Sequence, residues 1–355
     1  MKDLTLPVFT IYPLADARWE ELVSRHPRAD VFHTTNWLAA LERTYGYEPV
    51  AFTTSRPGDS LENGLVFCKV KSWITGRRLV SLPFSDHCEP LTDSAAEQEE
   101  LLAHVRQTVA RDGYAHAELR PKTTRDSVPW ASDTLAMEET FCLHTLSLDT
   151  PVDVLFHNLH KDCIQRKIRR AEREELIYES GRSEQLLRKF YHLLTRTRRR
   201  HFLPPQPLQW FQNLLELMGK HLTIRMVSRD QYPAAAMLTL SHKSTVTFKY
   251  GCSDERFHNL GGTPFLFWKT IQESKNQGKR ELDLGRSELD HAGLVQFKDR
   301  LGATQTSLPY WRYSSGKGSN GARPWWQLQM VKGMISWVPD PVLVASGRFL
   351  YRHIG

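Results

Sequence analysis

The sequence predicts an α/β chain made of two similar domains in tandem. Its 355 residues, 40% of them apolar, suffice for two cores of ordinary size. A strand–helix–strand pattern also occurs once in each half of the chain, which favours a duplicated unit. We therefore expect mixed sheets flanked by helices in residues 1–145 and 146–313, followed by a helical C-terminal tail over 314–355.

The clearer copy of this pattern lies in residues 244–302. Val246, Phe248 and Tyr250 alternate as in a strand, and a Gly-Gly pair then precedes a segment with helical spacing. Gly278 ends that segment before the second strand, RELDLGRS. Both strands run into polar, glycine-rich turns on the same side of the helix. In an α/β sheet, ligands bind at such an edge.

The earlier copy lies in residues 77–120. RRLVSLPFSDHCEPL is followed by a helix that stops at Asp112-Gly113 and then by YAHAELR, in the same order and with nearly the same spacing. Asp93 or Ser94 is the N-cap candidate of this helix. The alternative is that any two strand–helix–strand segments look alike at this level of detail.

Other segments give the rest of each domain. Residues 16–46 are expected to be mainly helical and residues 50–84 to form strands. A basic helix is expected from about 152 to 176, with four arginines three and four positions apart on one face: Arg166, Arg169, Arg170 and Arg173. A second helix, from 183 to about 198, ends before the Pro-Pro pair that follows Leu203.

The formal net charge is +7 and is unevenly distributed. Much of the excess lies in residues 161–173 and 196–201. Such a balance favours polyanionic partners, namely phosphate-bearing substrates, RNA or anionic lipid. A solvated basic face is the alternative.

The composition also bears on the compartment. The first residues lack the basic flank and cleavage site of a signal peptide, and no window approaches the roughly 18 uninterrupted apolar residues of a spanning helix. Five scattered cysteines fit reduced thiols and match neither a disulfide framework nor a metal knuckle. We expect a cytoplasmic protein, with peripheral attachment to the inner membrane left open.

Several motifs carry a family resemblance: RKIRRAE, TRTRRRH before Pro-Pro, PAAAMLTL, FKYGCSD with its Gly-Gly helix, LDLGRSE and GLVQFKDRLGA. Together they resemble the FemAB-type branch of the GNAT superfamily, including the BioF2-like acetyltransferase domain. They also resemble the subgroup found with bacterial exopolysaccharide and PEP-CTERM protein-sorting systems. The resemblance covers most of the chain and is strongest from Leu146 to Tyr313. It implies two GNAT-like domains.

The resemblance implies acyl transfer to an amine. Better studied members use aminoacyl-tRNA to extend the peptide of a peptidoglycan precursor, and wider relatives use acyl-CoA. We therefore expect no bound cofactor and no metal, and either acyl-CoA or aminoacyl-tRNA as the co-substrate. The acceptor amine is expected on a precursor of the cell envelope or of a polysaccharide. This precursor would bear phosphate and be either a small molecule or lipid-linked. A non-catalytic binding protein for RNA or lipid-linked sugar on the same fold is the alternative.

The resemblance also assigns residues. Lys298 matches a lysine beside the acyl donor, and Arg200, with its neighbour Arg199, matches an arginine that binds the acceptor's phosphates. Phe202 stands where relatives commonly have glycine. We expect Lys298 to point toward a cleft while Phe297 packs inward. Alternatively, Lys298 is a surface lysine and the arginines form a solvated cluster.

Further candidates come from the ends of the repeated strands. Asp283 and Arg286 sit at the C-terminal end of the strand in LDLGRSE and are assigned either to catalysis or to an ion pair that shapes the pocket floor. His201, Tyr250 and Ser253 are expected to bind substrate. Ser85 and His87 hold the equivalent place in the first domain, where His87 is either a base or a solvated loop residue.

The tail combines aromatic, apolar and basic residues. Such a composition suits a segment that lies in a membrane interface. Its aromatic residues are Trp325, Trp326, Trp337 and Phe349, and its basic residues are Lys332, Arg348 and Arg352. A terminal helix packed against the first domain is the alternative.

Overall fold

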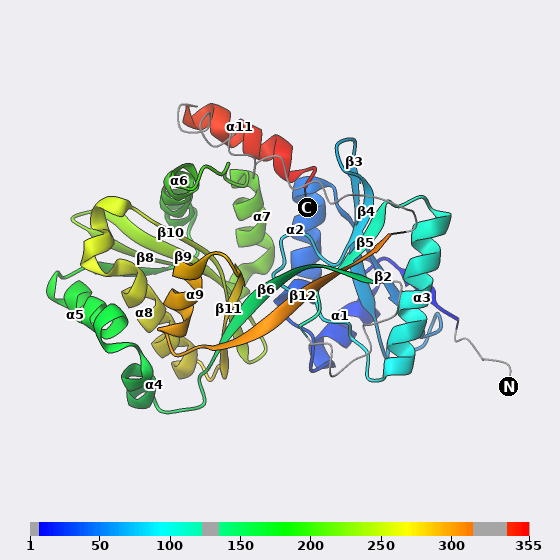
Figure 1. Ribbon diagram of the computed structural model, residues 1–355, viewed down its shortest axis with the longest axis horizontal. Helices are drawn as coiled ribbons and strands as arrows, with labels where there is room; N and C mark the ends of the chain where they lie inside the picture. Colours follow the sequence, from blue (N-terminus) through cyan, green and yellow to red (C-terminus); the bar gives the residue numbers. More distant parts are fainter. Residues whose placement is uncertain (1–6, 123–134, 315–338, 355) are drawn as a thin grey trace. The chain divides into compact units, whose positions relative to one another are not determined.

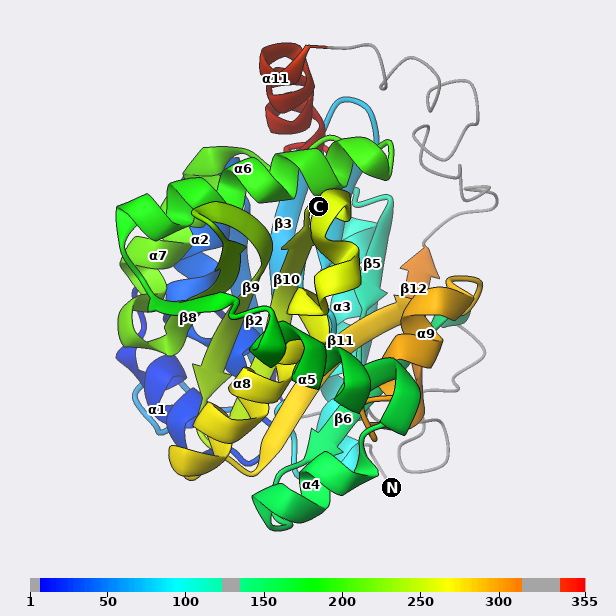
Figure 2. The same cartoon turned by 90° about the vertical axis from the view of Figure 1, so that its left-hand side faces the viewer.

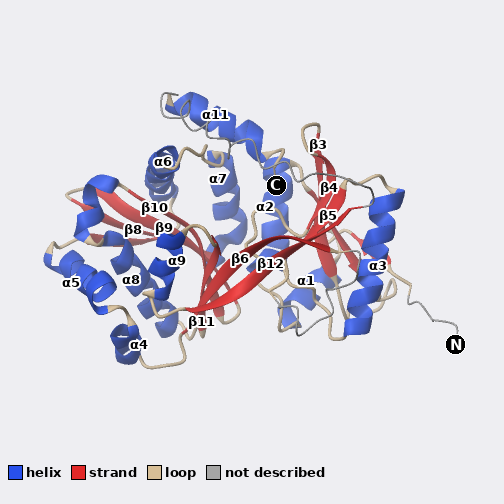
Figure 3. Ribbon diagram, viewed as in Figure 1, coloured by secondary structure: helices blue, strands red, loops and turns tan. Residues whose placement is uncertain are grey.

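The computed structural model describes residues 7–122, 135–314 and 339–354. The chain divides into two compact units. Unit 1 consists of Met1–Phe141, Ser307–Ala322 and Phe349–Gly355, and unit 2 consists of Cys142–Thr306 and Arg323–Arg348. Each contains a sheet of parallel and antiparallel strands with helices against it (Figures 1 and 3), which confirms the predicted fold class.

Unit 1 has the strand order β1-β2-β3-β4-β5-β12. Long strands β6 and β12 pass from one unit into the other. The elements are β1 Phe9–Ile11, α1 Ala17–Arg25, the 3₁₀ turn η1 Val31–His33, α2 Thr35–Tyr45, β2 Glu48–Thr53, β3 Leu65–Ser72, β4 Gly76–Val80, α3 Ala95–Arg111, β5 His116–Leu119, β6 Ala136–Ser147 and β12 Thr304–Ser314.

Helix α3 covers one part of this sheet with its apolar stripe. Leu101, Val105 and Val109 recur at helical spacing and pack with Phe67 and Ala117 of the strands. The helix begins with a capping box in which Ser94 Oγ accepts from the backbone N–H of Glu97. Of the two N-cap candidates, Asp93 and Ser94, the structure therefore has Ser94 in this role.

Unit 2 has the strand order β6-β11-β10-β9-β8-β7. Its elements are α4 Val152–Asn158, the π-helical turn η2 Lys161–Gln165, α5 Arg166–Arg173, β7 Ile177–Gly181, α6 Glu184–Arg200, α7 Leu208–Met218, η3 Gly219–His221, β8 Leu222–Arg229, β9 Tyr232–His242, β10 Thr245–Ser253, η4 Glu255–Leu260, α8 Gly262–Asn276, β11 Glu281–Glu288 and α9 Ala292–Asp299; α11 Asp340–Tyr351 begins here and ends in unit 1.

Two helical layers pack against the strands of unit 2 (Figure 2). Helices α4, α5 and α8 contribute Leu155, Ile168 and Phe267 to one core cluster with the strands. Helices α6 and α7 form another layer, in which Phe190 and Phe211 meet edge to face with ring centroids 5.7 Å apart. The expected duplication has a structural counterpart: β4–α3–β5 and β10–α8–β11 each join two parallel, hydrogen-bonded strands through a helix.

The predicted basic helix is wrong as a continuous element. Leu159 is extended, with φ −66° and ψ 139°, and it separates α4 from η2 and α5. Gln165 Nε2 donates to the carbonyl oxygen of Leu159 at 2.8 Å and so satisfies a backbone group released by the break. The arginine face of α5 is nevertheless as expected, with Ile168 and Ala171 buried on the other side.

Helix α6 ends in a Schellman turn at an unusual residue. The Leu203 N–H donates to the carbonyl oxygen of Arg198, and the Phe202 N–H donates to that of Arg199, both at 2.9 Å. Phe202 adopts φ +56°, a left-handed conformation that normally favours glycine. The turn therefore forms although phenylalanine replaces the glycine that the resemblance suggested.

The predicted C-terminal helix is present as α11. Its end is bonded to unit 1, because the Tyr47 hydroxyl donates to the carbonyl oxygen of Tyr351 at 2.5 Å. The tail residues Trp325, Trp326, Lys332 and Trp337 lie outside the described residues. Within the described ranges, no helix is both long and apolar enough to cross a bilayer.

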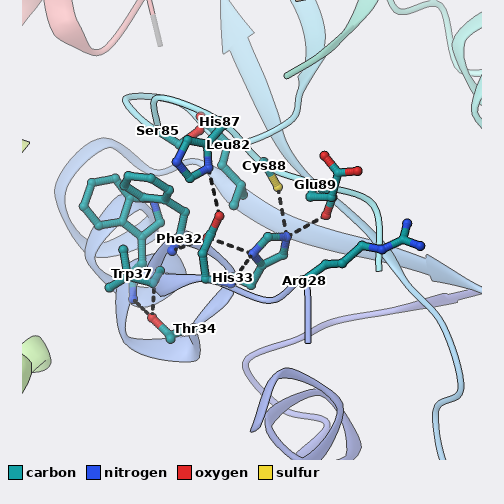
Figure 4. Close-up of polar contacts among 12 residues, drawn as sticks. Arg28, Phe32, His33, Thr34, Trp37, Leu82, Ser85, His87, Cys88 and Glu89 are labelled. Atoms are coloured by element: carbon teal, nitrogen blue, oxygen red, sulfur yellow. Dashed lines mark hydrogen bonds and ion pairs between the residues drawn. The ribbon is translucent and has the colours of Figure 1, made fainter. Parts of the chain in front are cut away.

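A buried polar cluster lies beside η1 in unit 1 (Figure 4). The two carboxylate oxygens of Asp30 lie 2.9 Å from Nδ1 of His33 and 2.9 Å from Nδ1 of His87. Nε2 of His33 contacts the carbonyl oxygen of Glu89 at 2.8 Å and Cys88 Sγ at 3.5 Å. Burial alone would raise the pKa of Asp30, but the two histidines hold it well below its usual range. Burial likewise opposes charge on His33, yet Cys88 and Asp30 raise its pKa well above the ordinary value.

Replacing this carboxylate gives a pH-dependent loss of stability. A histidine whose pKa is raised on folding contributes fully below its unfolded pKa, near 6.5, and loses that contribution as the pH rises through its folded pKa. Asp30→Asn should lower the free energy of unfolding by about 3 kcal/mol near pH 6, and the deficit should shrink at higher pH. Urea unfolding across this range measures it.

Asp59→Asn, at an exposed position of the same unit, is the matched control and should change little at any pH. A deficit for Asp30→Asn that is independent of pH would contradict the charged state assigned to His33.

Candidate functional site

The end of β10 and the start of α8 form a tight corner in unit 2. Asp254 caps η4, where its carboxylate accepts from the N–H of Arg256 at 3.1 Å. Gly261 then adopts φ +80°. A Cβ atom at Gly261 would lie 2.2 Å from the carbonyl oxygen of Lys167 in α5, so a side chain here would clash with backbone. Glycine thus allows α5 to approach the N-terminus of α8.

The C-terminal end of α6 is bonded to this corner. Thr197 Oγ1 donates to the carbonyl oxygen of Ser253 at 3.1 Å and accepts from its N–H at 3.0 Å. Arg200 donates to the same carbonyl oxygen at 3.1 Å and to Ser253 Oγ at 3.4 Å. Two of the predicted substrate-binding residues, Arg200 and Ser253, are therefore in direct contact.

A buried carboxylate orders the neighbouring arginines. Asp254 is 2% exposed and forms ion pairs with Arg196 at 2.8 Å and with Arg256 at 2.7 Å. The hydrogen bond from Arg256 holds the pKa of Asp254 below its usual value. Because long arginine side chains otherwise sample many rotamers, these pairs fix where the two guanidinium groups lie.

His258 is the last residue of this cluster and lies against Ser253. Its Nε2 lies 2.8 Å from Ser253 Oγ, and its pKa is lowered by burial and then by the positive charge of Arg200. The imidazole is therefore neutral at neutral pH. We call Arg196, Arg200, Ser253, Asp254, Arg256 and His258 the β10–α8 corner; it holds three guanidinium groups against one carboxylate.

The corner suits an anion chemically. The first N–H groups of a helix have no partner within the helix, and the helix dipole places partial positive charge there. Helix α8 runs from Gly262 to Asn276, long enough for this effect, and Arg256 lies in η4, the turn that directly precedes it. A phosphate group is the ligand that this combination favours.

The other predicted substrate-binding residues of unit 2 are engaged elsewhere. Tyr250 is buried, its hydroxyl accepts from Trp210 Nε1 at 2.8 Å, and its ring meets Phe211, so it packs with α7. Arg199 forms an ion pair with Asp340 at the start of α11. His201 is the C-cap residue of α6, and partial burial of its ring together with nearby arginines lowers its pKa.

Lys298 does not have the expected orientation. It is 2% exposed, and its Nζ donates to the carbonyl oxygens of Gly285 at 2.8 Å and Arg286 at 3.1 Å. Gly285 adopts φ +69°, which turns the end of β11 out of regular strand geometry and offers these carbonyls to the ammonium. The alternative of a surface lysine is therefore wrong, and the ammonium expected to point toward a cleft is bonded to backbone carbonyls. Phe297 packs on Phe267, as expected.

The two other catalytic candidates lie in the same turn. Asp283 is fully buried, and its Oδ1 accepts from the N–H of Gly285 at 2.8 Å. Arg286 contributes its carbonyl oxygen to Lys298. The structure thus brings Asp283, Arg286 and Lys298 together around one backbone turn.

Ser85 and His87 belong to unit 1 and are buried. Ser85 Oγ donates to the carbonyl oxygen of Leu82 at 2.7 Å, and His87 contacts Asp30 in the cluster of Figure 4. The alternative of a solvated loop histidine is wrong, because His87 has no exposed surface.

The sequence interpretation did not select four residues of the corner, Arg196, Asp254, Arg256 and His258, nor Thr197, which is bonded to it. The available signal was the Asp-x-Arg pattern directly after a strand, which is typical of a capped turn. The contacts of Arg196 and Thr197 could not be found this way, because they join segments more than fifty positions apart.

A groove of about 340 Å³ lies near the other end of α8, lined by Val152, Tyr178, Lys269, Gln272, Glu273 and Asn276. Its main polar groups bond to one another or to the sheet: Tyr178 donates to Glu273 at 2.5 Å, and Arg225 donates to Glu273 at 2.8 Å. The charge and geometry of the corner make it the stronger candidate site.

Comparisons with known proteins show which family a part of the sequence matches. Residues 159–298 match the family model of an acetyltransferase (GNAT) domain, and every corner residue lies within that range. The sequence matches no curated protein.

Solved structures share the fold at low identity. FemX is 12% identical, with a TM-score of 0.70 over 87% of this chain and 97% of its own. A tandem GNAT protein from the clavulanic acid biosynthesis pathway is 10% identical, with a TM-score of 0.54 over 88% and 99%. L-PGS from Bacillus licheniformis is 13% identical, with a TM-score of 0.53 over 79% and 88%. Residues 159–298 thus match a GNAT acetyltransferase domain, and the fold of the chain is similar to those of FemX and of a tandem GNAT protein.

Proposed function

We propose that this protein is an N-acyltransferase of the FemAB type that moves an acyl or aminoacyl group from an activated donor to an amine. The β10–α8 corner is the observation that carries the proposal, because both donor classes, acyl-CoA and aminoacyl-tRNA, bear phosphate. GNAT-fold proteins use acyl-CoA as co-substrate, which makes it the first donor to test.

In the reaction, the lone pair of the amine attacks the acyl carbon and a C–N bond forms. The donor's C–S or C–O bond then breaks, the leaving thiolate or alkoxide takes a proton, and the amine loses one. The protein's contribution is to hold the phosphates while the acyl carbon and the amine are brought together. We assign phosphate binding to Arg200, Arg256 and the first N–H groups of α8.

The basic face of α5 supports a larger polyanionic carrier. Arg166, Arg169 and Arg173 are exposed on this helix, and the close contact between Lys167 and Gly261 places α5 beside the corner. A tRNA or a lipid-linked phosphate would extend beyond the corner onto such a face. One structural neighbour is named a lysylphosphatidylglycerol synthetase, which by its name concerns an aminoacylated phospholipid and supports a phosphate-bearing acceptor from the cell envelope.

We propose further that Lys298 is a positioning residue. Its ammonium joins α9 to the turn that contains Asp283 and Arg286. Arg286 remains the candidate for a group that contacts substrate, since it lies toward the end of β11, the parallel neighbour of β10, whereas the buried Asp283 holds the turn.

The proposed activity predicts transfer in a direct assay. Purified protein supplied with acetyl-CoA or with aminoacyl-tRNA, and with amine acceptors that do or do not carry phosphate, should release free CoA or free tRNA together with an amide product detected by mass spectrometry. Donor binding without transfer to any amine would instead favour a non-catalytic binding protein.

Arg200→Gln tests the corner. Loss of a charge-assisted contact to phosphate should weaken binding of coenzyme A or tRNA about tenfold to a hundredfold, as titration calorimetry would show. The free energy of unfolding should change by less than about 0.5 kcal/mol, because the replaced side chain is partly exposed. Arg188→Gln on the same helix, paired at the surface with Glu184, is the matched control and should bind normally. Equal affinities for the two variants would remove Arg200 from the site.

Lys298→Met should affect both stability and turnover. Two buried carbonyl oxygens lose their donor, which costs about 1–3 kcal/mol, so the melting temperature should fall. Assayed below the melting transition, kcat should fall at least about tenfold with KM nearly unchanged, because the turn that carries Asp283 shifts.

Lys275→Met is the matched control, since Lys275 Nζ also donates to a backbone carbonyl, that of Leu148 at 2.7 Å. It should lose stability without losing kcat. A folded Lys298→Met variant with normal kcat would leave the lysine a purely structural role.

A further inference from the structure

The hairpin between β3 and β4 carries an exposed aromatic side chain at its tip. Trp73 is 78% exposed and its neighbour Ile74 is 43% exposed. The hairpin projects from the sheet of unit 1 (Figure 1). Monomeric proteins seldom leave a tryptophan this open, because its ring has the largest apolar surface of any side chain.

The tip is held in a fixed conformation. Ser72 Oγ accepts from the backbone N–H groups of Ile74 at 3.1 Å and Thr75 at 3.0 Å, which closes the turn. Thr75 Oγ1 and Arg78 Nη2 then donate to the carbonyl oxygen of His353, at 3.0 and 2.9 Å. The exposed ring is therefore presented by a turn that is bonded to the end of the chain.

The last turn of α11 extends the apolar surface. The Phe349 ring, 50% exposed, lies 6.1 Å from that of Trp73, and the His353 ring lies 5.7 Å from Trp73 and 5.0 Å from Phe349. We call Trp73, Ile74 and Phe349, with the exposed cations Lys71, Arg77 and Arg352, the hairpin patch. All six belong to unit 1.

The two segments that form the patch contribute only positive charges, and the nearby Asp112 side chain is paired with Arg111. Lys71 and Arg77 are cross-strand partners at the base of the tip, and Arg352 is the first residue after α11. Neither of the two contributing segments, KSWITGRR and FLYRHI, contains an acidic residue. An apolar tip flanked by three cations complements a bilayer surface, which carries negative headgroups outside and hydrocarbon beneath them.

We propose that the hairpin patch docks the protein on an anionic phospholipid bilayer, with Trp73, Ile74 and Phe349 inserted at the headgroup level. Tryptophan prefers this zone because it has an apolar body and a polar N–H. Each cation adds attraction to the negative surface, which falls off within about a Debye length. Membrane binding through this patch does not depend on which acyl donor or acceptor the protein uses.

Vesicle sedimentation of the full chain tests the proposal. The protein should bind vesicles of mixed phosphatidylglycerol and phosphatidylcholine, bind phosphatidylcholine alone much less, and dissociate as salt rises. Trp73→Ala should lower the partition coefficient about tenfold. The double variant Lys71→Gln/Arg352→Gln should lower it about fivefold for each charge.

Matched controls lie at other exposed positions. Tyr232→Ala removes an aromatic ring that is 62% exposed in unit 2, and Arg28→Gln/Arg56→Gln removes two exposed charges of unit 1; both should bind as the original chain does. Circular dichroism should show the same melting for every variant, since the altered side chains are at the surface.

Equal partitioning of Trp73→Ala and the original chain would overturn the proposal, as would binding that ignores lipid charge. The proposal would also be overturned if Trp73 were needed for self-association or for nucleic-acid binding while the protein did not bind vesicles. Donor turnover in solution should stay normal in the Trp73→Ala variant, so membrane docking and catalysis can fail separately.

Discussion

The close approach of α5 to the start of α8 is the constraint on which the candidate site depends. The backbone of Lys167 lies where any side chain at position 261 would have to be. With glycine there, the chain turns through φ +80° and the helix begins directly after η4. A larger residue would push α5 away from the N-terminus of α8. One missing Cβ atom thus allows the two helices to come together at this corner.

The same corner contains its own counter-charge, and this explains how several cations remain ordered. Isolated arginines at a surface lose side-chain entropy for little gain. The buried carboxylate of Asp254 changes this balance, because it forms ion pairs with Arg196 and Arg256 and leaves Arg200 to the Ser253 backbone. A preorganised set of guanidinium groups loses less entropy on binding an anion, which favours the corner as a ligand site over a solvated basic face.

Sequence pattern predicted those features that depend on local periodicity. The parallel pair β10 and β11 and the helix between them followed from alternation and glycine stops, as did the cap at Ser94. Contacts across the sequence were not predictable: Arg200 and Ser253 were both singled out, but nothing in the sequence joins them. Lys298 was misplaced because α9 has only eight residues, too few for a hydrophobic stripe to define its buried face. The break at Leu159 was missed because the helical pattern continues across it.

The two units share a strand–helix–strand connection but differ in the loop after its first strand. After β4, Leu82 and Phe84 adopt positive φ, and the loop ends in a cluster where Asp30 is neutralised by two histidines away from solvent. After β10, the chain instead presents Arg256, and α6 contributes Arg196 and Arg200 to the same corner. Strain and buried charge in the first loop can therefore serve to hold its own conformation, whereas charge in the second lies where a ligand can reach it. The proposed phosphate site therefore belongs to unit 2, whose loop presents its cations at the surface, and the sequence that matches a GNAT acetyltransferase domain lies in the same unit.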